Sequence, residues 1–231
     1  MAKKEVVKDI FDDIAPKYDL LNHLLSLNID KGWRKKAMKH IGEKQKGRLL
    51  DVACGTGDFS IAAYRSGVDR VTGIDISANM VEVGRKKVRE LGLNDHIDLQ
   101  LGDSERMNFD TGTFDIVTVA FGVRNFEHLE QGLKEMCRVL KPGGKVIILE
   151  FSMPVHFPMK QLYRFYFRYV LPVVGGWISG NKGAYTYLPE SVMKFPQGEA
   201  FLKILTRCGF RNAIRQKLSA GIASIYVGEK E

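Results

Sequence analysis

The chain has 231 residues, 45% of them hydrophobic, and carries a formal net charge of +8. That length suits one α/β domain with additions, and the apolar fraction allows a sizeable core. The basic surplus favours a polyanionic partner, either nucleic acid or an anionic membrane face, with an ordinary soluble basic surface as the alternative.

Cysteine usage and apolar runs narrow the class further. Cys54, Cys137 and Cys208 are scattered, without the spacing of a zinc site, so we expect no metal and a reducing compartment. The N-terminal residues lack the apolar core of a secretion signal. No run approaches the roughly 18–20 apolar residues of a membrane span. The sequence therefore predicts a cytoplasmic protein, with the inner face of the cytoplasmic membrane as a further location.

Residues 1–46 are predicted to form a helical cap. Apolar side chains recur at helical spacing in three stripes, over residues 6–14, 20–25 and 33–41, and Pro16 interrupts the pattern between the first two. Helices that precede the first strand of a nucleotide-binding sheet commonly pack over its C-terminal edge, where ligands bind.

A glycine-rich stretch, residues 47–75, predicts half of a nucleotide-binding βαβαβ unit. An apolar strand over 49–53 leads into Cys54-Gly55-Thr56-Gly57-Asp58, followed by a helix and by a second strand that ends at Asp75. Gly55 and Gly57 let the backbone approach a ligand closely. An acid some twenty residues beyond the glycines is placed to bind ribose hydroxyls.

The identity of the nucleotide follows from what flanks these glycines. Ser60 stands where a dinucleotide fingerprint has its third glycine, and no P-loop lysine is present. Asp51 and Asp58 would repel a pyrophosphate but suit a ligand that carries an ammonium and a sulfonium. The pattern therefore predicts S-adenosylmethionine (SAM).

The remaining core reads as alternating helices and strands. A helix capped by Ser77 ends at Gly92, and strands follow at 97–101 and 114–121. A helix over 129–140, a turn over 141–144 and a strand over 145–151 complete the core, which we place at 47–153. Residues 154–198 form an aromatic and basic, lid-like insertion. The C-terminal part, 199–231, predicts a helix and an antiparallel strand pair at the sheet edge.

This layout resembles the Rossmann-like class I SAM-dependent methyltransferases, whose α/β fold has a seven-stranded, mostly parallel sheet with an antiparallel last strand. The segments APKYD, DVACGTGDF, GIDIS, FGVRN and RVLKPGGKVIILEFS make the chain similar to the ubiquinone/menaquinone biosynthesis C-methyltransferase family. The resemblance runs from about Ile10 to the C-terminus. The combination of APKYD with FGVRN is its most specific part.

The resemblance implies a SAM site along the strand ends. Asp51 or Asp58 would face the amino group, directly or through water, and Asp75 would take the ribose diol. Tyr18 would close over SAM. Ala120 stands where many relatives have Ser, which leaves a backbone contact there. The other implied SAM-binding residues are Gly55, Thr56, Gly57, Ile76, Asp103 and Ser104.

The family's reaction, as the resemblance implies it, adds a methyl group to a ring carbon of a polyprenylated quinol. Arg124 would stabilise the phenolate-like oxygen, since a guanidinium stays charged. A buried ion pair that holds its loop is the alternative role. Asn125 would orient the substrate or a water. The base stays open among Tyr18, Asp19, His23, His128 and a bound water; we place Tyr18 and Asp19 with Arg124 and Asn125 as catalytic candidates.

The substrate tail and the choice of quinone remain hypotheses. Residues 157–178 are interpreted as a lid, a tunnel wall or a membrane contact through Trp177 and the nearby arginines, with an ordinary core helix as the alternative. A start without a transit peptide favours a bacterial enzyme. We expect demethylmenaquinol as the acceptor, with a ubiquinone precursor second. A homodimer is kept open.

Three other functions are weighed. A nucleic-acid methyltransferase would carry an Asn-Pro-Pro-Tyr type motif where FGVRN stands, or a nucleophilic cysteine that none of the three provides. We therefore expect no nucleic-acid partner. A methyltransferase of another small lipid and a non-catalytic SAM-binding scaffold are the remaining alternatives.

Overall fold

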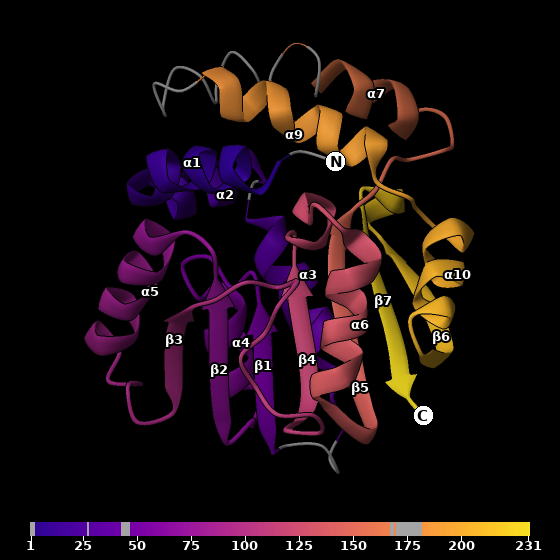
Figure 1. Ribbon diagram of the computed structural model, residues 1–231. Helices are drawn as coiled ribbons and strands as arrows, with labels where there is room; N and C mark the ends of the chain where they lie inside the picture. Colours follow the sequence, from indigo (N-terminus) through magenta and orange to yellow (C-terminus); the bar gives the residue numbers. More distant parts are fainter. Residues whose placement is uncertain (1–2, 27, 43–46, 167–168, 170–181) are drawn as a thin grey trace.

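A computed structural model describes residues 3–26, 28–42, 47–166, 169 and 182–231. Its described strands form one seven-stranded sheet in the order β3-β2-β1-β4-β5-β7-β6 (Figure 1). The strands are β1 (Arg48–Val52), β2 (Arg70–Asp75), β3 (Ile97–Leu101), β4 (Phe114–Ala120), β5 (Leu140–Phe151), β6 (Phe210–Leu218) and β7 (Ala223–Lys230).

The sheet direction confirms the predicted fold class. Strands β1 to β5 pair in parallel, and β7 runs antiparallel to both β5 and β6. The central strands are apolar nearly throughout, as strands covered on both faces must be. One face packs against α3 (Ile29–Met38), α4 (Asp58–Arg65) and α5 (Ala78–Glu90). The other packs against α6 (Leu129–Val139) and α10 (Glu199–Arg207).

The start of β5 corrects one prediction. Residues 141–144, expected as a turn before the strand, lie within β5, which begins at Leu140. Phe114 pairs with Leu140 and Ile116 already pairs with Lys145, so the extra residues bulge out of the register between them. Leu140 is fully buried against β4. This burial keeps the chain in the sheet at the residue before the bulge over 141–144.

The N-terminal residues are helical, as predicted, but they divide between two places. The helices α1 (Lys4–Ile14) and α2 (Tyr18–Leu25), joined by the 3-10 turn η1 (Ala15–Lys17), lie over the C-terminal ends of the parallel strands (Figure 1). Helix α3 instead packs on a sheet face, where Trp33 and Ala37 join the core beside α4. Only α1, η1 and α2 therefore cap the strand ends.

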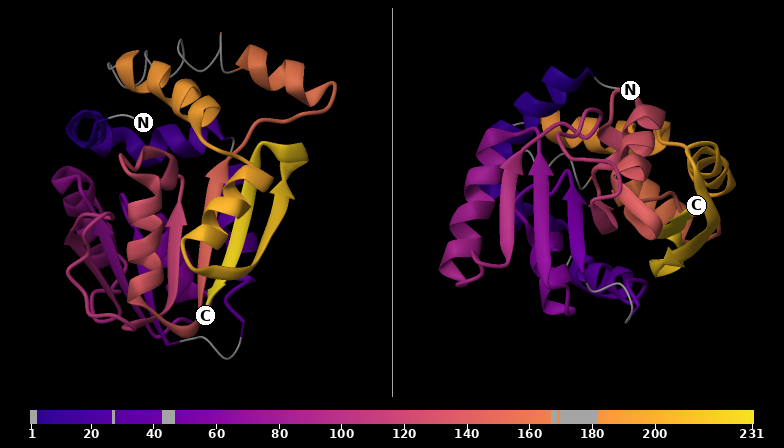
Figure 2. Two further views of the ribbon diagram at one scale, coloured as in Figure 1. Left: turned by 45° about the vertical axis from the view of Figure 1, so that its right-hand side comes forward. Right: turned by 60° about the horizontal axis from the view of Figure 1, so that its bottom comes forward.

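Above these helices lies a further layer. Helices α7 (Met159–Phe165) and α9 (Lys182–Lys194) cross the top of the molecule, with α9 against α1 (Figures 1 and 2). Val192 of α9 packs with Ile14 and Met80, which ties this layer to the cap and to α5. Trp177 lies outside the described residues. None of the described helices is long and apolar enough to span a membrane.

Candidate active site

A cavity opens beneath α1 and α2, at the ends of the parallel strands. The glycine loop forms its floor because the chain must turn sharply between β1 and α4. Gly57 adopts a φ of 80°, and a Cβ there would lie 3.0 Å from Leu99 Cδ1. Predicted SAM-binding residues that line this cavity are Tyr18, Gly55, Asp75, Ile76, Ser104 and Ala120.

Asp75 ends β2 with its carboxylate on the cavity wall. Its Oδ2 accepts a hydrogen bond from the Gly55 N–H at 2.8 Å, and its Oδ1 accepts one from the Ser77 N–H at 2.9 Å. Burial raises the pKa of the carboxyl, and these backbone donors act in the opposite direction. Each oxygen keeps a lone pair for a further donor, so the carboxylate fits a ribose diol.

The far end of the cavity is closed by α1. Lys4 forms an ion pair with Asp103, and the Glu105 N–H donates to Asp103 Oδ1 at 2.9 Å. Asp103 is thus held beside the cavity, while its neighbour Ser104 lines it. The N-terminal helix therefore contacts the segment predicted to meet the adenine.

Asp51 lies behind the glycine loop rather than on the cavity wall. The side chain is fully buried, and it accepts hydrogen bonds from Thr118 Oγ1 at 2.8 Å and from Ser60 Oγ at 2.7 Å. Burial raises the pKa of Asp51 to about 6. Its oxygens hold α4 and β4 around the loop, and its predicted contact with an amino group stays a prediction.

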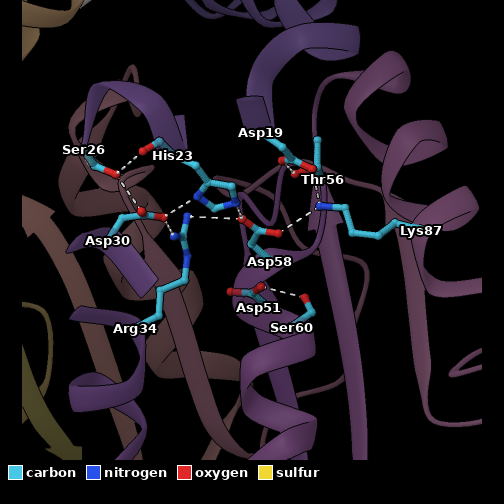
Figure 3. Close-up of polar contacts among 10 residues, drawn as sticks. All are labelled: Asp19, His23, Ser26, Asp30, Arg34, Asp51, Thr56, Asp58, Ser60 and Lys87. Atoms are coloured by element: carbon cyan, nitrogen blue, oxygen red, sulfur yellow. Dashed lines mark hydrogen bonds and ion pairs between the residues drawn. The ribbon is translucent and has the colours of Figure 1, made fainter. Parts of the chain in front are cut away.

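A polar network joins α2 and α3 to the glycine loop and α5 (Figure 3). Thr56 Oγ1 donates to Asp19, and Lys87 pairs with both Asp19 and Asp58, the latter at 2.9 Å. We call the ten residues drawn in Figure 3 the cap network: Asp19, His23, Ser26, Asp30, Arg34, Asp51, Thr56, Asp58, Ser60 and Lys87.

Three acids of the cap network, Asp19, Asp30 and Asp58, are already paired with cations. Burial alone would raise the pKa of Asp58, but the charges of Lys87 and Arg34 outweigh it and lower that pKa. His23 lies between Asp30 and Asp58, with Nδ1 3.1 Å from the first and Nε2 3.5 Å from the second. Although these three residues have the spacing of metal ligands, their carboxylates are paired with Arg34 and Lys87.

A second cavity lies between α1, α2, α3 and α9. Phe11, Tyr18 and Phe121 line both cavities, so these three rings form the partition between them. Phe121 adopts a φ of 58°, which is costly for a bulky residue and points to a functional constraint. Its ring stacks on Phe151 with a centroid separation of 4.3 Å. The second cavity is therefore an aromatic slot.

Arg124 lines this second cavity and is nevertheless part of a buried ion pair. Its Nη1 lies 2.8 Å from Glu150 Oε1, and its Nε donates to Ser191 Oγ at 3.3 Å. Among the described residues no partner is found for Nη2, which is the nitrogen left for a bound group. A buried ion pair was the alternative role predicted for Arg124 from the sequence, and this ion pair is present at the wall of the slot.

Asn125 lines the first cavity and accepts a hydrogen bond from a residue that lines the second cavity. Tyr187 of α9, which lines the second cavity, donates its hydroxyl hydrogen bond to Asn125 Oδ1 at 2.9 Å. Sequence reasoning missed Tyr187; its place among the aromatic residues of the insertion was the one available signal. His128 lies elsewhere, with 65% of its side chain exposed and its Nδ1 2.9 Å from Glu105.

The geometry places a cavity that contains the Asp75 carboxylate beside a second cavity lined by aromatic rings. A profile of the ubiE/COQ5 methyltransferase family matches residues 1–230 of the chain. The chain belongs to this family. It is 48% identical over 230 residues to the ubiquinone/menaquinone biosynthesis C-methyltransferase UbiE of Geotalea daltonii, covering 99% of this chain and 97% of that protein.

Other relatives agree with this assignment. The demethylmenaquinone methyltransferase of Bacteroides fragilis is 44% identical to this chain over 229 residues, which cover 99% of this chain and 94% of the relative. Among solved structures, a SAM-dependent methyltransferase of Thermotoga maritima, described as a possible histamine N-methyltransferase, aligns with a TM-score of 0.69 at 18% identity over 97% of this chain and 99% of that one. That likeness shows the fold alone.

The predicted family, fold and enzyme class are therefore confirmed, with SAM as the methyl donor of the family. The individual site residues stay predictions. Of the four catalytic candidates, Tyr18 and Asn125 line the first cavity and Arg124 lines the second. Asp19 lies in the cap network, turned to Thr56 and Lys87.

Proposed function

We propose that this family member transfers the methyl group of SAM to a ring carbon of a polyprenylated quinol, with demethylmenaquinol as the acceptor. One observation carries the proposal: two adjoining cavities share Phe11, Tyr18 and Phe121 as a common wall, and one contains the Asp75 carboxylate while the other is lined by aromatic rings. A planar quinol fits the aromatic slot. The names of the relatives from Geotalea and Bacteroides support the same acceptor class.

The SAM site we propose follows the first cavity. SAM supplies an electrophilic methyl group when bound, and the protein has to align it and exclude water. Asp75 binds the ribose hydroxyls, and the segment from Asp103 to Glu105 binds the adenine. Gly55 and Gly57 let the loop approach the methionine part, with Thr56 holding the loop through Asp19.

The acceptor needs a stabilised oxyanion and a route for its protons. Tyr18 is a poor base, because burial raises its pKa. Asp19 and His23 are engaged in the cap network. We therefore favour a water held by Arg124 and Asn125 as the group that accepts the proton of the quinol hydroxyl and, after methyl transfer, the proton that the ring carbon releases, while the guanidinium stabilises the oxygen as it loses its proton.

We also propose a peripheral contact with the inner face of an anionic membrane, from which a polyprenyl chain would enter. The outer side of the α7 region exposes apolar side chains, including 81% of Phe157, 58% of Leu162 and 59% of Phe165. Lys160 and Arg164 are exposed on the same helix. Apolar side chains flanked by cations are typical of interfacial helices.

Vesicle sedimentation tests this contact. Vesicles with phosphatidylglycerol should bind the protein at low salt, and Leu162→Ser/Phe165→Ser should weaken that binding. Ile214→Ser is a matched control, because Ile214 is 54% exposed on the edge strand β6. Equal binding of all three proteins would contradict the proposed surface, and so would no binding of the unmodified chain.

The acceptor is tested with pure protein, SAM and reduced quinone analogues. We expect methylation of a demethylmenaquinol analogue at the free ring carbon, identified by mass spectrometry and NMR, and slower turnover of a methoxy-benzoquinol analogue. Methylation of a sterol or of RNA in place of either quinol would overturn the proposal. Thermal stabilisation by SAM without turnover of any acceptor would favour a non-catalytic scaffold.

A further inference from the structure

Tyr187 is placed at the acceptor slot by helix α9. Its side chain is half-buried and lines the slot, and its hydroxyl lies 2.9 Å from Asn125 Oδ1. Burial raises the pKa of this phenol, with Arg124 acting against the shift. Tyr187 therefore keeps its proton at neutral pH and is available as a neutral hydrogen-bond donor.

The slot needs such a donor because its charges are largely paired. The guanidinium of Arg124 is paired with Glu150, with Nη1 2.8 Å from Oε1. Arg34 is paired with Asp30, and Ser26 donates to the same carboxylate at 2.6 Å. The residues that α1 contributes to the slot are apolar: Ile10, Phe11 and Ile14. An oxyanion formed there would therefore meet guanidinium groups that each already face a carboxylate.

Three further side chains at the slot carry a hydroxyl or an amide group: Tyr18, Asn22 and Tyr187. Tyr18 forms a side-chain hydrogen bond with Asn22 on the same helix, α2. Tyr187 differs, because its hydrogen bond runs to Asn125 on the loop after β4 and spans 62 residues of sequence. It thus joins the slot to the residue that faces the SAM cavity.

We propose that Tyr187 is a catalytic residue whose hydroxyl donates to the acceptor oxygen as that oxygen becomes a phenolate. The inference rests on the proposed function, since it assumes a phenolic acceptor. In the free protein Asn125 Oδ1 holds the hydroxyl in place. When the phenolate forms, the O–H turns to it, because a hydrogen bond to a charged oxygen is about twice as strong as a neutral one.

No bond of Tyr187 is made or broken in this step. The acceptor proton passes to the water held by Arg124 and Asn125, and Tyr187 keeps its own. The contribution is realised only as negative charge develops, so it affects turnover more than binding. A charge-assisted hydrogen bond of this kind corresponds to about a 10- to 100-fold effect on kcat.

Tyr187→Phe tests the proposal, because it keeps the ring and removes the hydroxyl. We expect kcat for the quinol analogue to fall about 10- to 100-fold, while the Kd for SAM from calorimetry stays within twofold. Tyr64→Phe is the matched control: this ring stacks on His96, with centroids 4.6 Å apart, and lines neither cavity. Its kcat should match that of the unmodified chain.

A second measurement does not depend on turnover. A nitro-substituted naphthol, bound with S-adenosylhomocysteine, ionises within the stability range of proteins and is followed by its absorbance. In Tyr187→Phe the pKa of the bound naphthol should be raised by about one unit relative to the unmodified chain, which corresponds to a tenfold weaker preference for the anion. Tyr64→Phe should leave it unchanged.

The outcomes separate the two proposals. An unchanged naphthol pKa in Tyr187→Phe overturns the donor role, whether kcat falls through loosened packing or does not fall. A raised naphthol pKa together with lowered kcat supports it. If the unmodified chain methylates no quinol but the naphthol pKa still depends on Tyr187, the oxyanion role stands and the proposed quinol function fails.

Discussion

Arg124 and Glu150 form a buried ion pair at the wall of the aromatic slot, with Arg124 Nη1 2.8 Å from Glu150 Oε1. Glu150 is the second-last residue of β5 and is fully buried, so the carboxylate is fixed by the sheet. It also accepts a hydrogen bond from the Arg124 backbone N–H at 3.2 Å. The pair therefore fixes both the guanidinium and the loop that carries Asn125. The same contact thus stabilises the fold and positions the proposed catalytic side chains.

Removal of Arg124 should abolish turnover and destabilise the fold. Arg124→Ala leaves Glu150 buried without its partner, which typically costs about 3–5 kcal/mol. Arg124→Met/Glu150→Gln removes both charges and should recover most of that free energy of unfolding in urea, but not turnover. A double variant that methylates the quinol at the normal rate would remove Arg124 from the mechanism.

Acid should partly rescue the single variant. Burial raises the pKa of Glu150, and the charge of Arg124 opposes that rise. Without Arg124 the folded state binds the Glu150 proton more tightly than the unfolded state does, so the free energy of unfolding falls as pH rises above the unfolded pKa. The difference in stability between Arg124→Ala and the unmodified chain should therefore narrow towards pH 4. A constant difference would contradict this account.

Asp51 gives a pH dependence to the unmodified protein. Its pKa of about 6 exceeds the ordinary value of 3.8, so the folded state holds a proton that the unfolded state has lost. Stability contributed by this group is full below about pH 4 and falls as pH rises to about 6, by about 3 kcal/mol. Asp51→Asn should flatten that part of the stability profile, measured by urea unfolding; an unchanged slope would count against it.

Asp75 should decide SAM affinity. Asp75→Ala removes an acceptor for two hydroxyls and leaves the Gly55 and Ser77 N–H groups without their partner. We expect the Kd for SAM to rise about 100-fold or more by calorimetry, since hydrogen bonds to a charged group contribute about 1.5–3 kcal/mol each. Asp98→Asn, at an exposed position on β3, is the control. Comparable Kd values for the two variants would place the diol elsewhere.

Much of the fold follows from local pattern. The apolar run before Gly55 and the buried run from Phe114 to Ala120 predict central parallel strands, and Ser77 caps α5 through the Met80 N–H as its position suggests. Those features are set by neighbours in sequence. The bulge in β5 was missed because Leu140 stays in the sheet through its burial, which local glycine and proline signals cannot reveal.

The candidate site was predicted in part for the same reason. Asp75 and Gly55 stand within one βαβ unit, so their relation is visible in spacing. Tyr187 meets Asn125 across 62 residues, and Thr56 meets Asp19 across 37. Such contacts depend on how α9 and α2 cross the strand ends, and a single sequence carries no periodic signal for that crossing. The cap network is therefore a finding of the structure.

Lys87 offers a direct test of the cap network, because one amine joins α5 to acids from two other elements. Its Nζ lies 2.9 Å from Asp58 Oδ1 and also pairs with Asp19 of α2. Lys87→Met should loosen α2 over the glycine loop and raise KM for SAM about fivefold, with kcat changed less than twofold. The Lys87 side chain is 22% exposed, so we expect the free energy of unfolding to fall by no more than about 1 kcal/mol.

Two further variants separate this linkage from a general charge effect. Lys86→Met removes the neighbouring lysine, which is 73% exposed and 3.9 Å from Glu90, and should leave KM unchanged. Lys87→Arg keeps the charge and should restore most of the affinity. Because Asp58 keeps Arg34 and His23 as partners, the loop itself should stay folded, and hydrogen exchange should increase in α2 rather than in α4. Equal effects of Lys86→Met and Lys87→Met on KM would show that α2 is not held by this contact.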